Sequence, residues 1–211
     1  MALVPQQKLN KRRKMRNIIE QQKIKEAVRA IAIASGIDFV NNGTLIESHI
    51  LYTRNDITER SGIVELIKAQ DKKVDGVRNI DSARLNTGEA FICTGVAFSV
   101  ASGREALANE GDFSKLDFQR TMSNRGVTAF FNNEFSLKIS NKEKLNVIVR
   151  HGMQGSQTDE PMYNHHCPVT PFVIDQNQSI LPQINCFQPV GTKDEPVVFE
   201  MALIGYRLTS N

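Results

Sequence analysis

Cysteine is scarce in this sequence, and long hydrophobic runs are missing. Three cysteines, Cys93, Cys167 and Cys186, are an odd number without the spacing of a disulfide framework. We therefore expect reduced and mostly buried thiols in a cytosolic product. The longest apolar patch near the N-terminus, residues 30–34, is far too short to span a bilayer. No apolar segment with a small-residue cleavage site follows the first basic residues, so a secretory signal is not predicted.

The short motifs that mark common catalytic sites are missing as well. The chain contains no GxxxxGK[ST], GxGxxG, HExxH or GxSxG. Adjacent carboxylates occur at Asp159 and Glu160 and at Asp194 and Glu195, but both pairs lie in proline-flanked loops, where solvated charges are the simplest interpretation. No catalytic residue is therefore predicted, and an enzyme is the less favoured class.

Four residues with metal-binding side chains occur in the second half of the chain: His151, His165, His166 and Cys167. Imidazole and thiolate groups suit zinc, and jelly-roll barrels can hold metals between strands. Adjacent residues on a strand point to opposite faces, however, so His165 and His166 would not both face one ion. We therefore predict no metal and no cofactor. Nothing local marks Cys93 or Cys167 as a nucleophile paired with a histidine.

What the sequence has in excess is positive charge near its N-terminus. Residues 1–30 hold nine Lys or Arg and two Glu, a net charge of +7, whereas the remainder holds 17 basic and 21 acidic side chains, a net charge of −4. The densest part of the arm contains six cations: Lys8, Lys11, Arg12, Arg13, Lys14 and Arg16. This asymmetry is typical of an arm that binds a polyanion or the acidic surface of a sister subunit. Binding to nucleic acid would be independent of sequence, because the flanks offer no aromatic stacking platform.

The arm itself is predicted to be mainly helical. Strong helix formers fill residues 8–34, and no Gly or Pro interrupts them before Gly36. The apolar residues lie first on one face of a helical wheel and then on nearly the opposite face: Met15, Ile18 and Ile19, followed by Ile24, Val28 and Ile31. Either the helix is broken between these two groups or each half contacts a different surface.

Beyond Gly36 the apolar residues recur with a period of two, which is typical of β-strands. Predicted strands cover residues 44–53, 88–101, 145–149 and 196–210. Residues 127–139 fit either one half-buried strand or a hairpin that turns at Asn132 and Asn133, and residues 58–70 fit either a short helix or a strand. Two proline-containing runs, 169–175 and 179–187, favour edge strands. Gly95 interrupts a long apolar strand, so a β-bulge or a close backbone approach is expected there.

Seven to nine strands with long loops and no alternating helices predict an all-β antiparallel sandwich or barrel. We divide the chain into an arm, residues 1–36, and a β-domain, residues 37–211. The last strand is apolar on both faces and must therefore be covered on both sides, by the core and by something else. The residues predicted to face another subunit are Val198, Ile204, Tyr206 and Leu208.

Four segments carry the layout of the chain: KRRKMR at 11–16, GEAFICTGVAFSV at 88–100, EFSLKISNKEKLNVIV at 134–149 and VVFEMALIGYRL at 197–208. A basic arm followed by a many-stranded domain with a doubly apolar last strand resembles the single jelly-roll capsid proteins of small viruses and bacteriophages. The similarity is one of architecture and covers the whole chain. It implies a jelly-roll sandwich of about eight strands whose loops and edges contact neighbouring subunits.

The resemblance implies a virion structural protein, a capsid subunit of a bacteriophage that self-assembles through its β-domain and its arm. Its partners would be other copies of itself, other virion proteins and, through the arm, the viral genome; no small-molecule substrate is expected. It would be found in the virion and assembled in the host cytoplasm. Arms in that family are commonly disordered, so the helical character of this arm favours clamping between subunits.

Two alternatives remain open. The first is a cupin-like jelly-roll metalloenzyme that uses His151, His165 or His166. The second is a nucleic-acid-binding accessory protein in which the β-domain acts as a scaffold for the basic arm.

Overall fold

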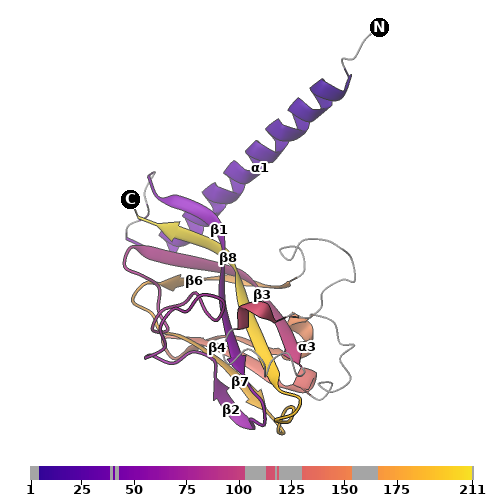
Figure 1. The fold of residues 1–211 in the computed structure, drawn as a ribbon. Helices are drawn as coiled ribbons and strands as arrows, with labels where there is room; N and C mark the ends of the chain where they lie inside the picture. Colours follow the sequence, from indigo (N-terminus) through magenta and orange to yellow (C-terminus); the bar gives the residue numbers. More distant parts are fainter. Residues whose placement is uncertain are drawn as a thin grey trace.

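A long N-terminal helix and eight strands make up the described chain (Figure 1). The computed structural model describes residues 5–38, 40, 43–102, 113–116, 118, 130–153 and 166–210, with side chains from residue 19 onwards in the first helix. The elements are α1 (Pro5–Ala34), β1 (Leu45–Asp56), β2 (Gly62–Glu65), β3 (Glu89–Ser102), η1 (Phe113–Lys115), β4 (Glu134–Ile139), β5 (Lys142–Ile148), α3 (Val149–Gly152), β6 (Cys167–Asp175), β7 (Ile180–Cys186) and β8 (Val197–Thr209).

The strands form two four-stranded antiparallel sheets. Sheet 1 has the order β1-β8-β3-β6, and sheet 2 has the order β2-β7-β4-β5. The two sheets pack face to face as a sandwich, and each sheet mixes strands from the beginning and the end of the domain, as a jelly roll does. The structure therefore confirms the predicted all-β jelly-roll sandwich of about eight strands, and it assigns residues 62–65 to a strand.

The core lies between the sheets and is centred on aromatic rings. The ring of Phe98 on β3 lies 4.8 Å from that of Phe135 on β4 and 5.5 Å from that of Phe199 on β8. All three side chains are fully buried. Tilted ring pairs at these distances add to the stabilisation from buried apolar area, so this cluster joins the two sheets.

The prediction that both proline-containing strands lie at sheet edges is confirmed for one strand and wrong for the other. Strand β6 is indeed at the edge of sheet 1, but β7 lies between β2 and β4, so the prediction for residues 179–187 was wrong. The carbonyl of Pro182 accepts a hydrogen bond from the N–H of Leu66 at 2.9 Å. The nitrogen of a strand residue points to the same side as its carbonyl, so the missing N–H of Pro182 faces the region just past the end of β2. Because β2 ends at Glu65, no residue of β2 is left without a hydrogen-bond donor opposite Pro182, and proline is tolerated in the inner strand β7.

Candidate interaction surface

The last turns of α1 are anchored on the outer face of sheet 1. Val28 and Ala32 are buried in one cluster with Ile46 of β1, Ile92 of β3 and Leu208 of β8. Val28 and Ile31 of the second apolar group therefore pack on the chain's own sheet, whereas Ile24 is exposed. The helix is unbroken from Pro5 to Ala34, and Ile19 of the first apolar group is exposed as well.

A glycine cap fixes the point at which α1 ends. Gly36 has φ +79°, and its N–H donates to the carbonyl of Ile33 at 3.0 Å, while the N–H of Ile37 donates to Ala32 at 3.2 Å. These two bonds form a Schellman motif, which glycine favours because it adopts positive φ without steric cost. Ile37 is buried in the same cluster as Ala32. The cap thereby sets the direction in which α1 leaves the domain.

Beyond this anchor α1 projects away from the sandwich (Figure 1). Residues 19–27 are all exposed, and the large side chains of Ile19 and Ile24 are 47% and 43% accessible. A helix that is uncovered on every side gains no tertiary packing and is only marginally stable in water. The projecting part of α1 is therefore a surface suited to a partner.

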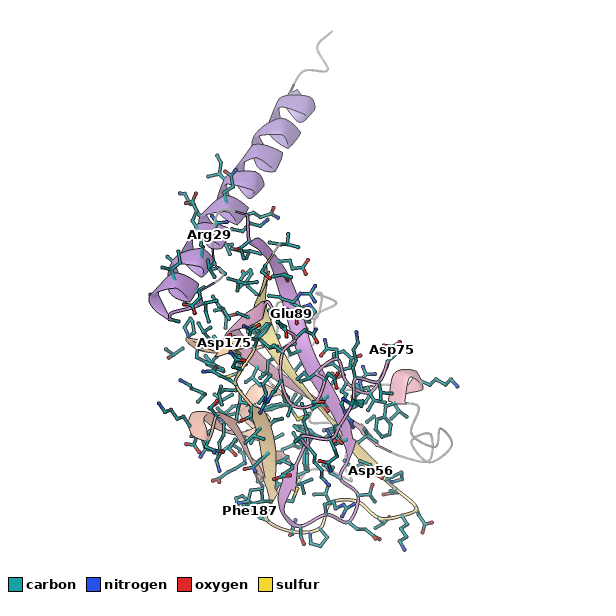
Figure 2. The ribbon with its side chains drawn as sticks, turned by 90° about the vertical axis from the view of Figure 1, so that its left-hand side faces the viewer. Arg29, Asp56, Asp75, Glu89, Asp175 and Phe187 are labelled. Carbon is teal, nitrogen blue, oxygen red and sulfur yellow. The ribbon has the colours of Figure 1, made fainter. Side chains whose placement is uncertain are left out.

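The six predicted contact cations of the arm all belong to this projecting helix, although their side chains lie outside the described residues: Lys8, Lys11, Arg12, Arg13, Lys14 and Arg16. Figure 2 shows Arg29 close to the base of α1, where the helix meets the domain. The Nε of Arg29 is buried and has no hydrogen-bond acceptor within the described part of the chain. Positive charge thus runs from the anchor to the outer end of the helix.

The predicted interface on β8 needs a correction for two of its four residues. Leu208 is buried by the anchored end of α1, and Val198 is buried by Leu116 and Ala101, with Phe113 and Phe118 packed beside them. The chain itself covers the outer face at both ends of β8, so these two residues need no external cover. Ile204 and Tyr206, between those covers, are half-exposed, and their assignment to a subunit interface stays a prediction.

Sequence analysis missed a buried ion pair on the same outer face. Arg54 Nε lies 2.7 Å from Glu200 Oε2, and the hydroxyl of Ser99 donates to Glu200 Oε1 at 2.7 Å. Arg54 also donates to the carbonyls of Gly76 at 2.7 Å and Phe113 at 3.2 Å. One guanidinium thus ties two connecting segments to the sheet. The available signal was a glutamate within an otherwise apolar stretch of the last strand, because a buried carboxylate requires a partner.

A cavity of about 200 Å³ lies beside the other end of β1 and is lined by His49, Glu89 and Arg207 among others. Arg207 is already held by Glu47, to which its Nε donates at 3.0 Å, and lies 3.7 Å from Glu89. Burial and the nearby Arg207 lower the pKa of His49, which therefore stays mainly neutral at pH 7. The cavity is lined largely by charged and polar side chains, of which Arg207 is paired with Glu47 and Glu89.

Two of the three histidines of the predicted metal alternative lie within the described residues. His151 lies on α3, His166 packs beside Gly95, and His165 lies outside the described residues. Among the residues that the structure does describe, no group of three or more His, Cys, Asp or Glu side chains is placed to hold a metal ion. In the same part of the chain, no helix is both long and apolar enough to cross a membrane.

The three cysteines should differ sharply in reactivity. Burial raises the pKa of Cys93 to about 12 and that of Cys186 to about 11, whereas Cys167 is half-exposed. The thiolate is the nucleophile, so iodoacetamide at about pH 8 is expected to modify Cys167 in the folded protein and to spare the other two. Peptide mass spectrometry after labelling measures this, and labelling in denaturant, where all three should react, is the control. Equal labelling of Cys93 and Cys167 in the folded protein would contradict the burial described here.

No protein-family model matches this chain, and no curated protein sequence matches it either. Function is therefore inferred from the fold and its surfaces.

Proposed function

We propose that this chain is a structural protein that assembles with copies of itself. More specifically, we propose a capsid subunit of a bacteriophage, assembled in the host cytoplasm with other virion proteins and found in the virion. The observation that carries the proposal is the projecting basic helix, which no described part of the domain covers over residues 19–27. An uncovered helix on a closed sandwich is simplest to explain if a second molecule covers it.

The strand order is compatible with this proposal and with others. Jelly rolls of the orders β1-β8-β3-β6 and β2-β7-β4-β5 serve as shell subunits and lectins as well as cupin enzymes. Fold alone does not choose among these. The charge asymmetry and the uncovered helix favour assembly.

Sedimentation analysis of the purified full chain in low and high salt tests the proposal. The intact chain is expected to form oligomers or shells, and deletion of residues 1–20 is expected to prevent this while the melting transition of the β-domain remains. The deletion leaves Val28 and Ala32, which anchor the helix on sheet 1, so the domain should stay folded. A strict monomer in every condition would refute self-assembly.

The same deletion separates assembly from the nucleic-acid alternative. If the arm serves only to bind nucleic acid, the shortened protein should keep its oligomeric state and lose a salt-dependent affinity for single- or double-stranded DNA or RNA. If the arm clamps subunits, the oligomer itself should be lost. A binding titration beside the sedimentation run reports both quantities on the same protein.

A further inference from the structure

The end of the sandwich opposite α1 exposes two large apolar side chains. Ile63 on β2 is 70% accessible, and Phe187, directly after β7, is 60% accessible. Ile63 pairs across the strands with Asn185, two residues before Phe187. Figure 2 shows Phe187 and Asp56 at the end of the molecule farthest from α1. Exposed side chains of this size lose favourable burial unless a partner covers them.

Hydrogen bonds hold this end in a defined shape. The N–H of Phe187 donates to Asn133 Oδ1 at 3.1 Å. The N–H of Glu59 donates to the carbonyl of Val190 at 2.7 Å, which joins the β1–β2 connection to the segment before β8. Thr58 Oγ1 accepts a bond from the N–H of Val197 at 2.9 Å. The surface is therefore largely preformed, which lowers the entropic cost of binding.

Carboxylates occur in the strands and connections at this end of the sandwich. Five are exposed, and none of them forms an ion pair within the described residues: Asp56, Glu59, Glu65, Asp194 and Glu195. Ile63, Phe187 and these five carboxylates are here named the distal patch. Arg60 and Lys193 are the exposed cations in the same connections. Lys68, which lines a groove beside Glu65, is exposed as well, so the five carboxylates and these three cations carry a net charge of −2.

A groove of about 560 Å³ opens beside Ile63, between β2, the end of β1 and residues 68–78. Three carboxylates and three cations line it. Asp71 and Arg78 among them form a pair at 3.6 Å. The groove itself is therefore neutral, and the negative charge comes from its rim at Glu59, Asp194 and Glu195. The groove is lined mainly by polar and charged side chains, with Ile63 and Val64 as its apolar part, and such a concave surface beside an acidic rim suits a basic helix that exposes single apolar side chains.

The projecting part of α1 has the complementary chemistry. Ile19 and Ile24 are exposed on nearly opposite faces of the helix, so each can contact a different part of a partner surface, and residues 1–30 carry a net charge of +7. We propose that α1 of one copy docks on the distal patch of a second copy. This inference rests on the proposed self-assembly and specifies the contact that produces it.

The two surfaces lie at opposite ends of the molecule (Figures 1 and 2), so the contact is head-to-tail. A head-to-tail contact closes into a ring when the rotation between copies allows it and otherwise continues into an open array. The part of α1 beyond its anchored turns is roughly 35 Å long at 1.5 Å per residue.

Two blocked variants of the full chain test the contact. The patch variant carries Ile63→Lys and Phe187→Lys, and the arm variant carries Ile19→Glu and Ile24→Glu. All four positions are exposed, so both variants should melt as the unmodified protein does. Each alone is expected to associate at least about tenfold more weakly in sedimentation velocity, as loss of a central apolar anchor does. An equimolar mixture of the two variants is expected to form dimers only. The patch variant keeps an intact arm and the arm variant keeps an intact patch, so each mixed pair can make one contact and no more.

Matched controls use exposed apolar residues outside the two surfaces. Leu45→Lys changes the first residue of β1, and Ile33→Glu changes the anchored end of α1; both residues are exposed, and both variants should assemble as the unmodified chain does. If the patch variant assembles normally, or if the mixture stays monomeric, the docking inference is wrong while self-assembly stands. If the unmodified chain is itself monomeric, the proposed function fails, and the docking inference fails with it.

Discussion

Replacing Gly205 with alanine is expected to lower the free energy of unfolding by about 3 kcal/mol or more. Gly205 lies in β8, between His49 of β1 and Cys93 of β3. A Cβ atom at this position would overlap the backbone carbonyl oxygen of Ile92 and lie 3.0 Å from the ring of Phe91. The obstacle is backbone in the middle of an inner strand, so relief requires separating β8 from β3. Since small domains have about 5–15 kcal/mol of stability, urea unfolding should show a much lower midpoint.

Gly62→Ala is the matched control for this substitution. Gly62 has φ +75°, and an added Cβ would have no atom within 4 Å. Its cost should be about 1 kcal/mol, from the left-handed backbone alone. Comparison of the two variants separates backbone overlap from the general effect of losing a glycine. Equal unfolding midpoints for Gly205→Ala and the unmodified protein would show that β8 and β3 are not packed as closely as the structure places them.

Local signals in the sequence predicted the features that depend on neighbouring residues. Gly36 was expected to end the arm helix, and it forms the C-terminal cap of α1. Gly95 was expected to mark a bulge or a close approach, and the register of β3 shifts between Cys93 and Gly95, where the ring of His166 occupies the space of a Cβ. In each case the backbone conformation or the missing side chain is the cause, and both can be read from one residue and its immediate context.

Contacts between distant parts of the chain could not be predicted in the same way. The apolar outer face of β8 indicated that something must cover it, but the pattern contains no information about which segment does so. The cover of Leu208 comes from Val28 on α1, and the cover of Val198 comes from the segment around Leu116. Likewise, proline is tolerated in the inner strand β7 because its neighbour β2 is short. The periodicity of residues 58–70 did not distinguish a strand from a helix, so this arrangement could not be predicted. These features follow from tertiary packing, which outweighs local preference.

Arg54→Ala is expected to destabilise the domain by about 3 kcal/mol. The side chain of Glu200 is 4% exposed and that of Arg54 is 20% exposed, so removal of the guanidinium leaves a nearly buried carboxylate without its counter-ion. The substitution also removes the donors to the carbonyls of Gly76 and Phe113 and the cation that lies 4.4 Å from the centre of the Phe118 ring. Guanidinium chloride unfolding measures the loss, and limited proteolysis should show faster cleavage near Gly76.

The double variant Arg54→Met and Glu200→Met separates the cost of leaving a buried charge unpaired from the loss of the attraction between the two charges. When both charges are replaced by apolar side chains of similar length, no unpaired charge stays buried, so the double variant should be more stable than Arg54→Ala. The two single methionine variants complete a double-mutant cycle, and their coupling should exceed about 1 kcal/mol because the groups share hydrogen bonds. A loss below about 0.5 kcal/mol for Arg54→Ala, the size of an ordinary surface change, would mean that the pair does not hold the connecting segments on sheet 1. If Arg54→Ala lowers the free energy of unfolding without faster cleavage near Gly76, the Arg54–Glu200 pair stabilises sheet 1 but does not hold that connecting segment in place.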